Sequence, residues 1–267
     1  RLKGLTPGVI SRGYGGQAPH YPYLLNASST AAEAGDEPIL IHQRCQVPVA
    51  VGADRIASAN LLIEQGCDVI IADDGLQHYA LARDIELIIV DGNRRFGNGF
   101  LLPAGPLREG LWRLKQADHV IVNGGLSTGL MIQELDEIMM ELAPQSVCHL
   151  ISGETISLAS FKEKYPKINA MAGIGDPNRF FLTLKEQNFQ LNKNVGFVDH
   201  HGFNQDDLVQ FNAEDGEQLP LLMTEKDAVK CQGFAKEHWW YVPVNADISK
   251  EQGDKLMTDI YRIINAF

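Results

Sequence analysis

The sequence predicts an α/β protein with a mostly parallel sheet flanked by helices and a second, smaller α/β domain. Short apolar runs alternate with helical patterns, which is typical of βαβ units. The chain has 267 residues, 45% of them hydrophobic, so it is long enough to bury the cores of two domains. A polar stretch with prolines, residues 144–168, interrupts the alternation. We therefore expect one domain in residues 1–150 and a second in residues 151–267.

Nine apolar runs are predicted to be strands. They are GVIS (8–11), VAV (49–51), VIIA (69–72), ELIIV (86–90), HVIVN (119–123), INAMAG (168–173), GFV (196–198), PLLM (220–223) and WWYVPV (239–244). The run VIIA has the composition of a fully buried strand in a parallel sheet.

Two stretches between these runs are predicted to be longer helices. Residues 53–66 begin with Asp54 as a plausible cap and end at Gly66, as expected of a crossover helix. Its predicted apolar face consists of Ile56, Ala59, Leu62 and Ile63. Residues 127–142 have the same character.

Two shorter helices have recognisable starts. Asp36 is a good N-cap, with Pro38 in the first turn that follows. Thr224 with Asp227 forms a predicted capping box after a strand.

Composition excludes several classes of protein. With 23 basic and 34 acidic residues, the formal charge of −11 argues against nucleic acid bound through a general positive surface. The four cysteines form no C-x-x-C pair, so neither a disulfide framework nor a zinc site is indicated and a reducing compartment fits best. No stretch approaches the roughly 20 apolar residues of a membrane span.

Two adjacent acids, Asp73 and Asp74, follow the strand VIIA directly. Ligands of open α/β sheets bind at this end of the strands, and acids there commonly hold magnesium. An Asp-Gly turn is the alternative, but it explains Asp74 without explaining Asp73. Gln77 and His78 follow within reach of the same ion or substrate.

Two further stretches carry polar side chains just past a strand. SRGYGG, residues 11–16, combines glycines with Arg12, which suits a phosphate, although a simple glycine turn is equally consistent. In DHHGF, Asp199 is placed to orient an imidazole for proton transfer, with a metal site as the alternative.

The longest irregular segment, residues 91–110, contains Phe96, Phe100, Leu101 and Leu102. Loops of this length in compact domains are usually functional or disordered, and these apolar residues argue against simple disorder.

Eight stretches, in their order and spacing, resemble the tetraacyldisaccharide 4'-kinases, the lipid A 4'-kinases of Gram-negative bacteria. They are GVISRGYGG, GDEP, GADR, DDGLQH, PAGPLRE, AGIGDPNRFF, DHHGF and TEKDAVK, and the likeness runs from about residue 5 to residue 230. The resemblance implies a P-loop NTPase-like fold and a location on the cytoplasmic face of the inner membrane. It also implies transfer of the γ-phosphate of ATP, with Mg²⁺, to a tetraacylated glucosamine disaccharide 1-phosphate, the lipid A precursor.

The resemblance also assigns roles to acids of this chain. Asp73 and Asp74 would be the Walker B type acids, with Gln77 and Glu109 completing the magnesium shell. Asp36 would be the catalytic base.

In the same way, the resemblance makes His200 the partner of the base. It implies that Tyr14, His78 and Arg108 line the substrate and phosphate site.

No G-x-x-x-x-G-K-[ST] phosphate loop occurs in the chain. In the family this loop and an N-terminal membrane helix precede SRGYGG, so we expect both to lie outside these 267 residues and the chain alone to be inactive. The rival hypotheses are a metal-dependent phosphohydrolase that uses Asp73, Asp74 and His200, and a non-enzymatic module that binds lipid precursors.

Overall fold

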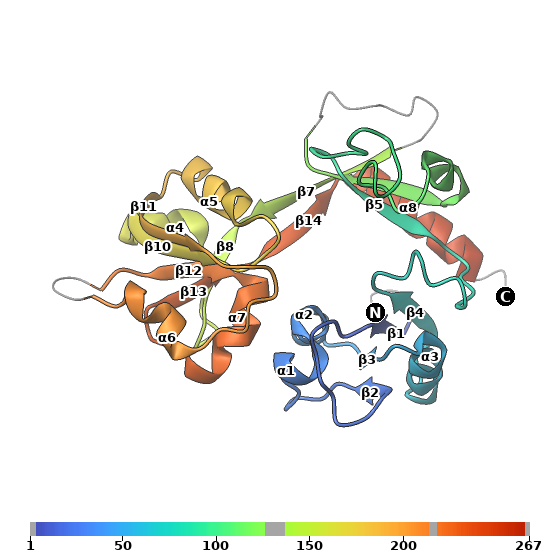
Figure 1. The fold of residues 1–267 in the computed structure, drawn as a ribbon, viewed down its shortest axis with the longest axis horizontal. Helices are drawn as coiled ribbons and strands as arrows, with labels where there is room; N and C mark the ends of the chain where they lie inside the picture. Colours follow the sequence, from blue (N-terminus) through green and yellow to red (C-terminus); the bar gives the residue numbers. More distant parts are fainter. Residues whose placement is uncertain (1–3, 126–136, 214–217, 265–267) are drawn as a thin grey trace. The chain divides into compact units, whose positions relative to one another are not determined.

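The computed structural model describes residues 4–125, 137–213 and 218–264 (Figure 1). Contacts divide the chain into two compact units. The larger unit combines Arg1–Gln77 with Pro144–Pro243, and the smaller unit combines His78–Ala143 with Val244–Phe267. These units are interleaved in the sequence, whereas the predicted domains are consecutive; the division at residue 150 stays a prediction.

The first part of the larger unit contains a four-stranded sheet of order β2-β3-β1-β4. Strands β3, β1 and β4 are parallel, and β2 is antiparallel to β3. Three helices accompany the sheet. The elements are β1 (Pro7–Ser11), β2 (Tyr23–Leu24), α1 (Ala31–Ala34), α2 (Asp36–Cys45), β3 (Val49–Val51), α3 (Arg55–Glu64) and β4 (Val69–Ala72).

Helix α3 confirms the predicted crossover helix and its cap. The Asp54 side chain accepts a hydrogen bond from the Ala57 N–H, and Gly66 has a φ of 83° at the end of the helix. The predicted apolar face is partly wrong, because Ile56 is 46% and Ile63 is 58% exposed. The helix instead turns Arg55, Ser58, Ala59 and Leu62 inward.

Strand β4 has the predicted bounds, but it is not fully buried as expected. Ile71 is 53% exposed. The reason is its place in the sheet, since β4 stands at an edge and pairs with β1.

The second part of the larger unit is a six-stranded sheet of order β11-β10-β12-β13-β8-β9 with helices on both faces (Figure 1). Strands β10 to β13 are mutually parallel, and β8 and β9 are antiparallel additions. The elements are β8 (Ser146–His149), β9 (Thr155–Ser157), α4 (Leu158–Lys164), β10 (Lys167–Ala172), α5 (Pro177–Glu186), β11 (Gln190–Gly196), α6 (Gln205–Leu208), η2 (Val209–Phe211), β12 (Leu221–Thr224), α7 (Glu225–Cys231), η3 (Gln232–Phe234) and β13 (Trp239–Val242).

Side chains of β10 alternate between two cores, one on each face of this sheet. Ile168 and Ala170 join the cluster that includes Phe161 of α4, whereas Met171 joins the cluster that includes Cys231 of α7. Both faces are therefore covered, as expected for parallel strands.

The smaller unit contains a sheet of order β14-β7-β6-β5, in which β5, β6 and β7 are parallel. Its elements are β5 (Leu87–Asp91), η1 (Leu111–Gln116), β6 (His119–Asn123), β7 (Glu137–Pro144), β14 (Val244–Ile248) and α8 (Lys250–Ile264). No helix among the described residues is long and apolar enough to cross a membrane.

Three sequence predictions are corrected here. The helix expected over 127–142 is wrong where it can be compared, because residues from Glu137 onward form strand β7 on β6; residues 127–136 lie outside the described part of the chain. The run GFV is mostly beyond β11, which ends at Gly196. The run WWYVPV is two strands, because β13 ends before Pro243, which has no N–H to donate.

Candidate active site

The centre of the candidate site is the carboxylate of Asp36, which is 5% exposed. Asp36 is the first residue of α2 rather than its N-cap, which is Gly35, so the cap expected from the sequence is wrong. Nδ1 of His200 lies 3.2 Å from each carboxylate oxygen. The backbone N–H of Glu37 donates a hydrogen bond to the same carboxylate at 3.0 Å. The start of α2 thus holds a buried anion where the helix dipole favours one.

Two lysines of α7 also face this carboxylate. Nζ of Lys226 and Nζ of Lys230 lie 3.9 Å and 3.8 Å from Asp36. Each lysine has a closer acid: Glu37 lies 2.9 Å from Lys226, and Asp227 lies 2.8 Å from Lys230. Two lysine–carboxylate pairs therefore lie around Asp36, and within each pair the charges offset one another.

Lys226 remains a cation in this setting. Burial lowers the pKa of Lys226, but the hydrogen bond to Glu37 and the charges of Asp36 and Asp199 outweigh burial and raise it above the ordinary lysine value.

The neighbours of His200 determine which ring nitrogen carries its proton. Nζ of Lys226 lies 3.5 Å from Nε2, and an ammonium group can only donate. Nε2 is therefore the acceptor, so the neutral ring carries its proton on Nδ1 and donates it to Asp36. Asp199 lies 3.8 Å from Nε2, and the ring of Tyr14 lies 5.2 Å from the imidazole.

Glycines allow SRGYGG to pack closely against the start of α2. A Cβ at Gly16 would lie 2.5 Å from the carbonyl oxygen of Glu33. A Cβ at Gly35, which has a φ of 88°, would lie 2.8 Å from the carbonyl oxygen of Tyr14. These two glycines bring Tyr14 beside His200.

A second cluster lies at the carboxyl ends of β1 and β4. The Ser11 hydroxyl donates a hydrogen bond to Asp73 at 2.9 Å. Arg55 is buried and donates to the carbonyl oxygens of Ile10 and Asp73, both at 2.9 Å. Arg55 therefore fixes the turn that presents the two acids.

The electrostatics of this cluster favour a bound cation. Burial is the main cause that raises the pKa of the Asp73 carboxyl above its ordinary value; the Ser11 hydrogen bond opposes this effect. The charges of Asp74 and Glu37 raise the pKa of Asp73 further. Because Glu37 adjoins Asp36, the two clusters are electrostatically coupled.

Asp73 and Asp74 offer two carboxylates, the kind of ligand that a magnesium ion would take at this site. A cation would offset the burial of the Asp73 carboxylate. The rival site with Asp73, Asp74 and His200 is not formed. In residues 4–125, 137–213 and 218–264 no group of three or more His, Cys, Asp and Glu is arranged to hold a metal.

The remaining predicted site residues are placed as follows. Gln77 lies in the turn after Asp74, and Arg12 lies near enough to Arg55 for their charges to interact. His78, Arg108 and Glu109 belong to the smaller unit, where Nε of Arg113 lies 3.2 Å from Glu109.

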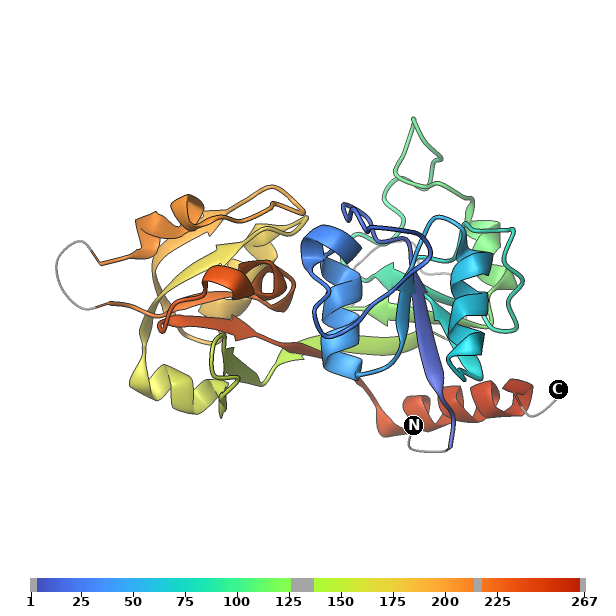
Figure 2. The ribbon, with the colours of Figure 1, turned by 90° about the horizontal axis from the view of Figure 1, so that it is seen from below.

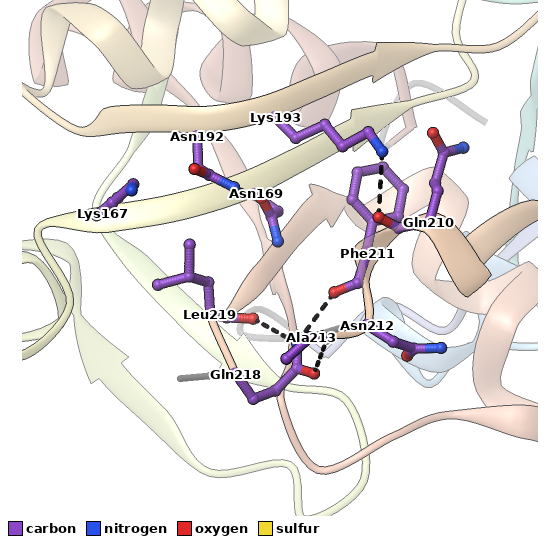
Figure 3. Close-up of a pocket in the computed structure, with 10 residues that line it drawn as sticks. All are labelled: Lys167, Asn169, Asn192, Lys193, Gln210, Phe211, Asn212, Ala213, Gln218 and Leu219. Carbon is purple, nitrogen blue, oxygen red and sulfur yellow. Dashed lines mark hydrogen bonds between the residues drawn. The ribbon is translucent and has the colours of Figure 1, made fainter. Parts of the chain in front are cut away.

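A pocket of about 420 Å³ lies away from this site (Figure 3). Its lining includes Lys167, the first residue of β10, and Leu219, which precedes β12. The candidate site lies at the opposite ends of these strands, where Gly173 donates to Asp227. None of the predicted site residues lines the pocket.

Sequence reasoning missed Lys226, Lys230 and Arg55. A capping box accounted for TEKDAVK, although the two lysines stand four residues apart, on one face of a helix. This spacing could have indicated that both lysines face the same partner. Arg55 belongs to GADR, one of the eight stretches that carry the resemblance, but nothing in the local sequence shows that this arginine is buried.

The chain is similar to known proteins of one family. A family model for the tetraacyldisaccharide-1-P 4'-kinases matches residues 1–262. The tetraacyldisaccharide 4'-kinase of Colwellia psychrerythraea is 62% identical over 93% of this chain and 71% of its own length. That of Psychromonas ingrahamii is 51% identical over 97% of this chain and 77% of its own length.

A solved structure supports the same relationship. LpxK of Aquifex aeolicus, crystallised in complex with ATP, matches with a TM-score of 0.78 and 28% identity over 98% of this chain and 80% of that one. The similarity confirms the predicted P-loop-kinase-like α/β fold. The chain belongs to the tetraacyldisaccharide-1-P 4'-kinase family.

Proposed function

We propose that the protein carrying this chain catalyses ATP-dependent phosphorylation of the 4'-hydroxyl of a tetraacyl glucosamine disaccharide 1-phosphate, a step of lipid A biosynthesis. The observation that supports the chemistry is the buried Asp36 carboxylate, held by His200 at 3.2 Å. Phosphoryl transfer to an alcohol requires a positioned group that accepts the hydroxyl proton.

In this mechanism Asp36 takes the proton of the 4'-hydroxyl as the oxygen attacks the γ-phosphorus and ADP leaves. His200 donates Nδ1–H to Asp36 and orients the carboxylate. Lys226 and Lys230 stabilise the charge that Asp36 needs before it can act as a base.

Asp73 and Asp74 are the residues that would hold Mg²⁺, with Gln77 and Glu109 as further proposed ligands. When bound, the ion neutralises charge on the phosphates. Arg12 and Tyr14 are proposed to line the substrate and phosphate site, and so are His78 and Arg108. A tetraacyl substrate resides in a bilayer, which supports a peripheral location on the cytoplasmic face of the bacterial inner membrane.

The proposal is tested by measuring the ratio of ADP to phosphorylated lipid that the protein forms. The full-length protein, given ATP and the lipid disaccharide 1-phosphate, should form ADP and 4'-phosphorylated lipid in equal amounts, measured by labelled phosphate and ³¹P NMR. Inorganic phosphate in place of phosphorylated lipid would contradict the proposal and favour the phosphohydrolase.

A further inference from the structure

The long loop of the smaller unit exposes three consecutive large apolar side chains. Phe100 is 63%, Leu101 is 49% and Leu102 is 62% exposed. Single exposed apolar residues are common, but a contiguous exposed run marks an interaction site. We call these three residues the apolar tip; its loop is the green segment that stands out from the ribbon in Figure 2.

The backbone of this loop is ordered around the apolar tip. Leu102 N–H donates to the Leu107 carbonyl at 2.8 Å, and Leu107 N–H donates to Phe100 at 3.2 Å. The Asn98 side chain donates to the Ala104 carbonyl at 2.9 Å and accepts from the Phe100 N–H at 3.2 Å. The three exposed side chains therefore lie on a turn whose backbone is fixed by hydrogen bonds.

The base of the loop is anchored in the smaller unit. Phe96 is 7% exposed. The Arg95 side chain, 2% exposed, makes two hydrogen bonds to Glu137, at 2.6 and 3.0 Å. One apolar residue of the loop thus supports the fold, whereas the three at the tip face outward.

The charge around the tip differs from that of the chain. Residues 92–108 contain three arginines and no acid, in a chain whose formal charge is −11. Arg95 is buried at the base, and Arg94 and Arg108 are exposed on the two sides of the tip in the sequence. Exposed arginines flanking apolar side chains complement a leaflet with anionic head groups.

We propose that the apolar tip inserts into an anionic lipid bilayer and docks the smaller unit on the membrane surface. The choice of a bilayer rests in part on the proposed function, since a tetraacylated substrate partitions into membranes. Insertion transfers Phe100, Leu101 and Leu102 from water into the interfacial region, while the exposed Arg94 stays among the head groups.

The test compares the full-length wild-type protein with the triple variant Phe100→Ser, Leu101→Ser, Leu102→Ser on phosphatidylethanolamine and phosphatidylglycerol vesicles. The affinity of the triple variant for vesicles, measured by co-sedimentation, should be at least about tenfold weaker, because three apolar side chains are lost from the interface. A matched control replaces three exposed apolar residues of the larger unit by serine and should bind as the wild type does. Its positions are Ile151, Leu182 and Val209, which are 51%, 56% and 54% exposed.

A reporter variant, Phe100→Trp, distinguishes insertion from binding elsewhere. Its added fluorescence should shift to shorter wavelength on vesicles and be quenched by brominated lipids. Unchanged emission from vesicle-bound protein, or equal binding by the triple variant, would overturn the proposal. Turnover of detergent-dispersed substrate should survive in the triple variant; absence of turnover in the wild type would count against the proposed function, not against docking.

Discussion

Replacing Asp36 by Asn separates a catalytic role from a structural one. The amide keeps the shape of the side chain but cannot accept the hydroxyl proton, so turnover should fall on the order of a hundredfold or more. Stability should change less. Lys226 and Lys230 keep acids at 2.9 and 2.8 Å, about 1 Å closer than Asp36.

The structural cost is therefore the loss of the hydrogen bond from His200 to a charged acceptor, about 1 to 3 kcal/mol. For a chain of this size such a loss lowers Tm by about 2 to 12 °C. Turnover is measured by labelled phosphate transfer and Tm by calorimetry, both in the full-length protein.

The matched control is Asp199→Asn, a carboxylate 3.8 Å from the same imidazole but 46% exposed. It should cost less than about fivefold in turnover, because exposed charge pairs contribute little. An Asp36→Asn enzyme that keeps more than a tenth of its turnover, or an equal loss in both variants, would refute the assignment of Asp36 as the base.

Three further predictions concern other parts of the site and fold. Asp74→Ala should abolish turnover at low magnesium and regain part of it as magnesium rises; Glu64→Ala, which removes an exposed acid of α3, should leave the magnesium requirement unchanged. Lys226→Met should lower turnover, because it removes a cation 3.9 Å from the Asp36 carboxylate, whereas Lys226→Arg, which keeps the charge, should lose less. Burial, followed by the charge of Lys236, lowers the pKa of His238 to about 4; the wild type should therefore lose stability as pH falls from about 6.5 toward 4, where the unfolded chain binds the proton first, and urea titrations of His238→Gln should show less of this loss.

The sequence predicted strands well where a β-branched run is bounded by turn residues, as in β3 and β6. It failed for β11, whose residues QLNKNVG are mostly polar and exposed. Pairing with β10 at the edge of the sheet stabilises that strand, and a single sequence does not contain that information. The expected helix failed for the same reason: residues 137–142 have a helix-like pattern, but parallel pairing with β6 decides their conformation.

The candidate site was predicted through the resemblance more than through spacing. Asp36 and His200 come from distant segments, so no local pattern links them. The lysines of α7 were not predicted for the same reason. Their partner, Asp36, lies almost two hundred residues earlier, and a helix face with two lysines ordinarily means solvent exposure.

The interleaved larger unit has a consequence for biosynthesis. The contact between His200 and Asp36 spans 164 residues, and the smaller unit's residues 78–143 are translated between them. At about 5 to 20 residues per second, a ribosome needs on the order of 10 to 30 s to proceed from β4 to α7. During that interval a nascent chain has the first sheet but neither His200 nor the lysines. Asp36 therefore lacks the three groups that surround it in the folded protein, and the site can form only late in translation.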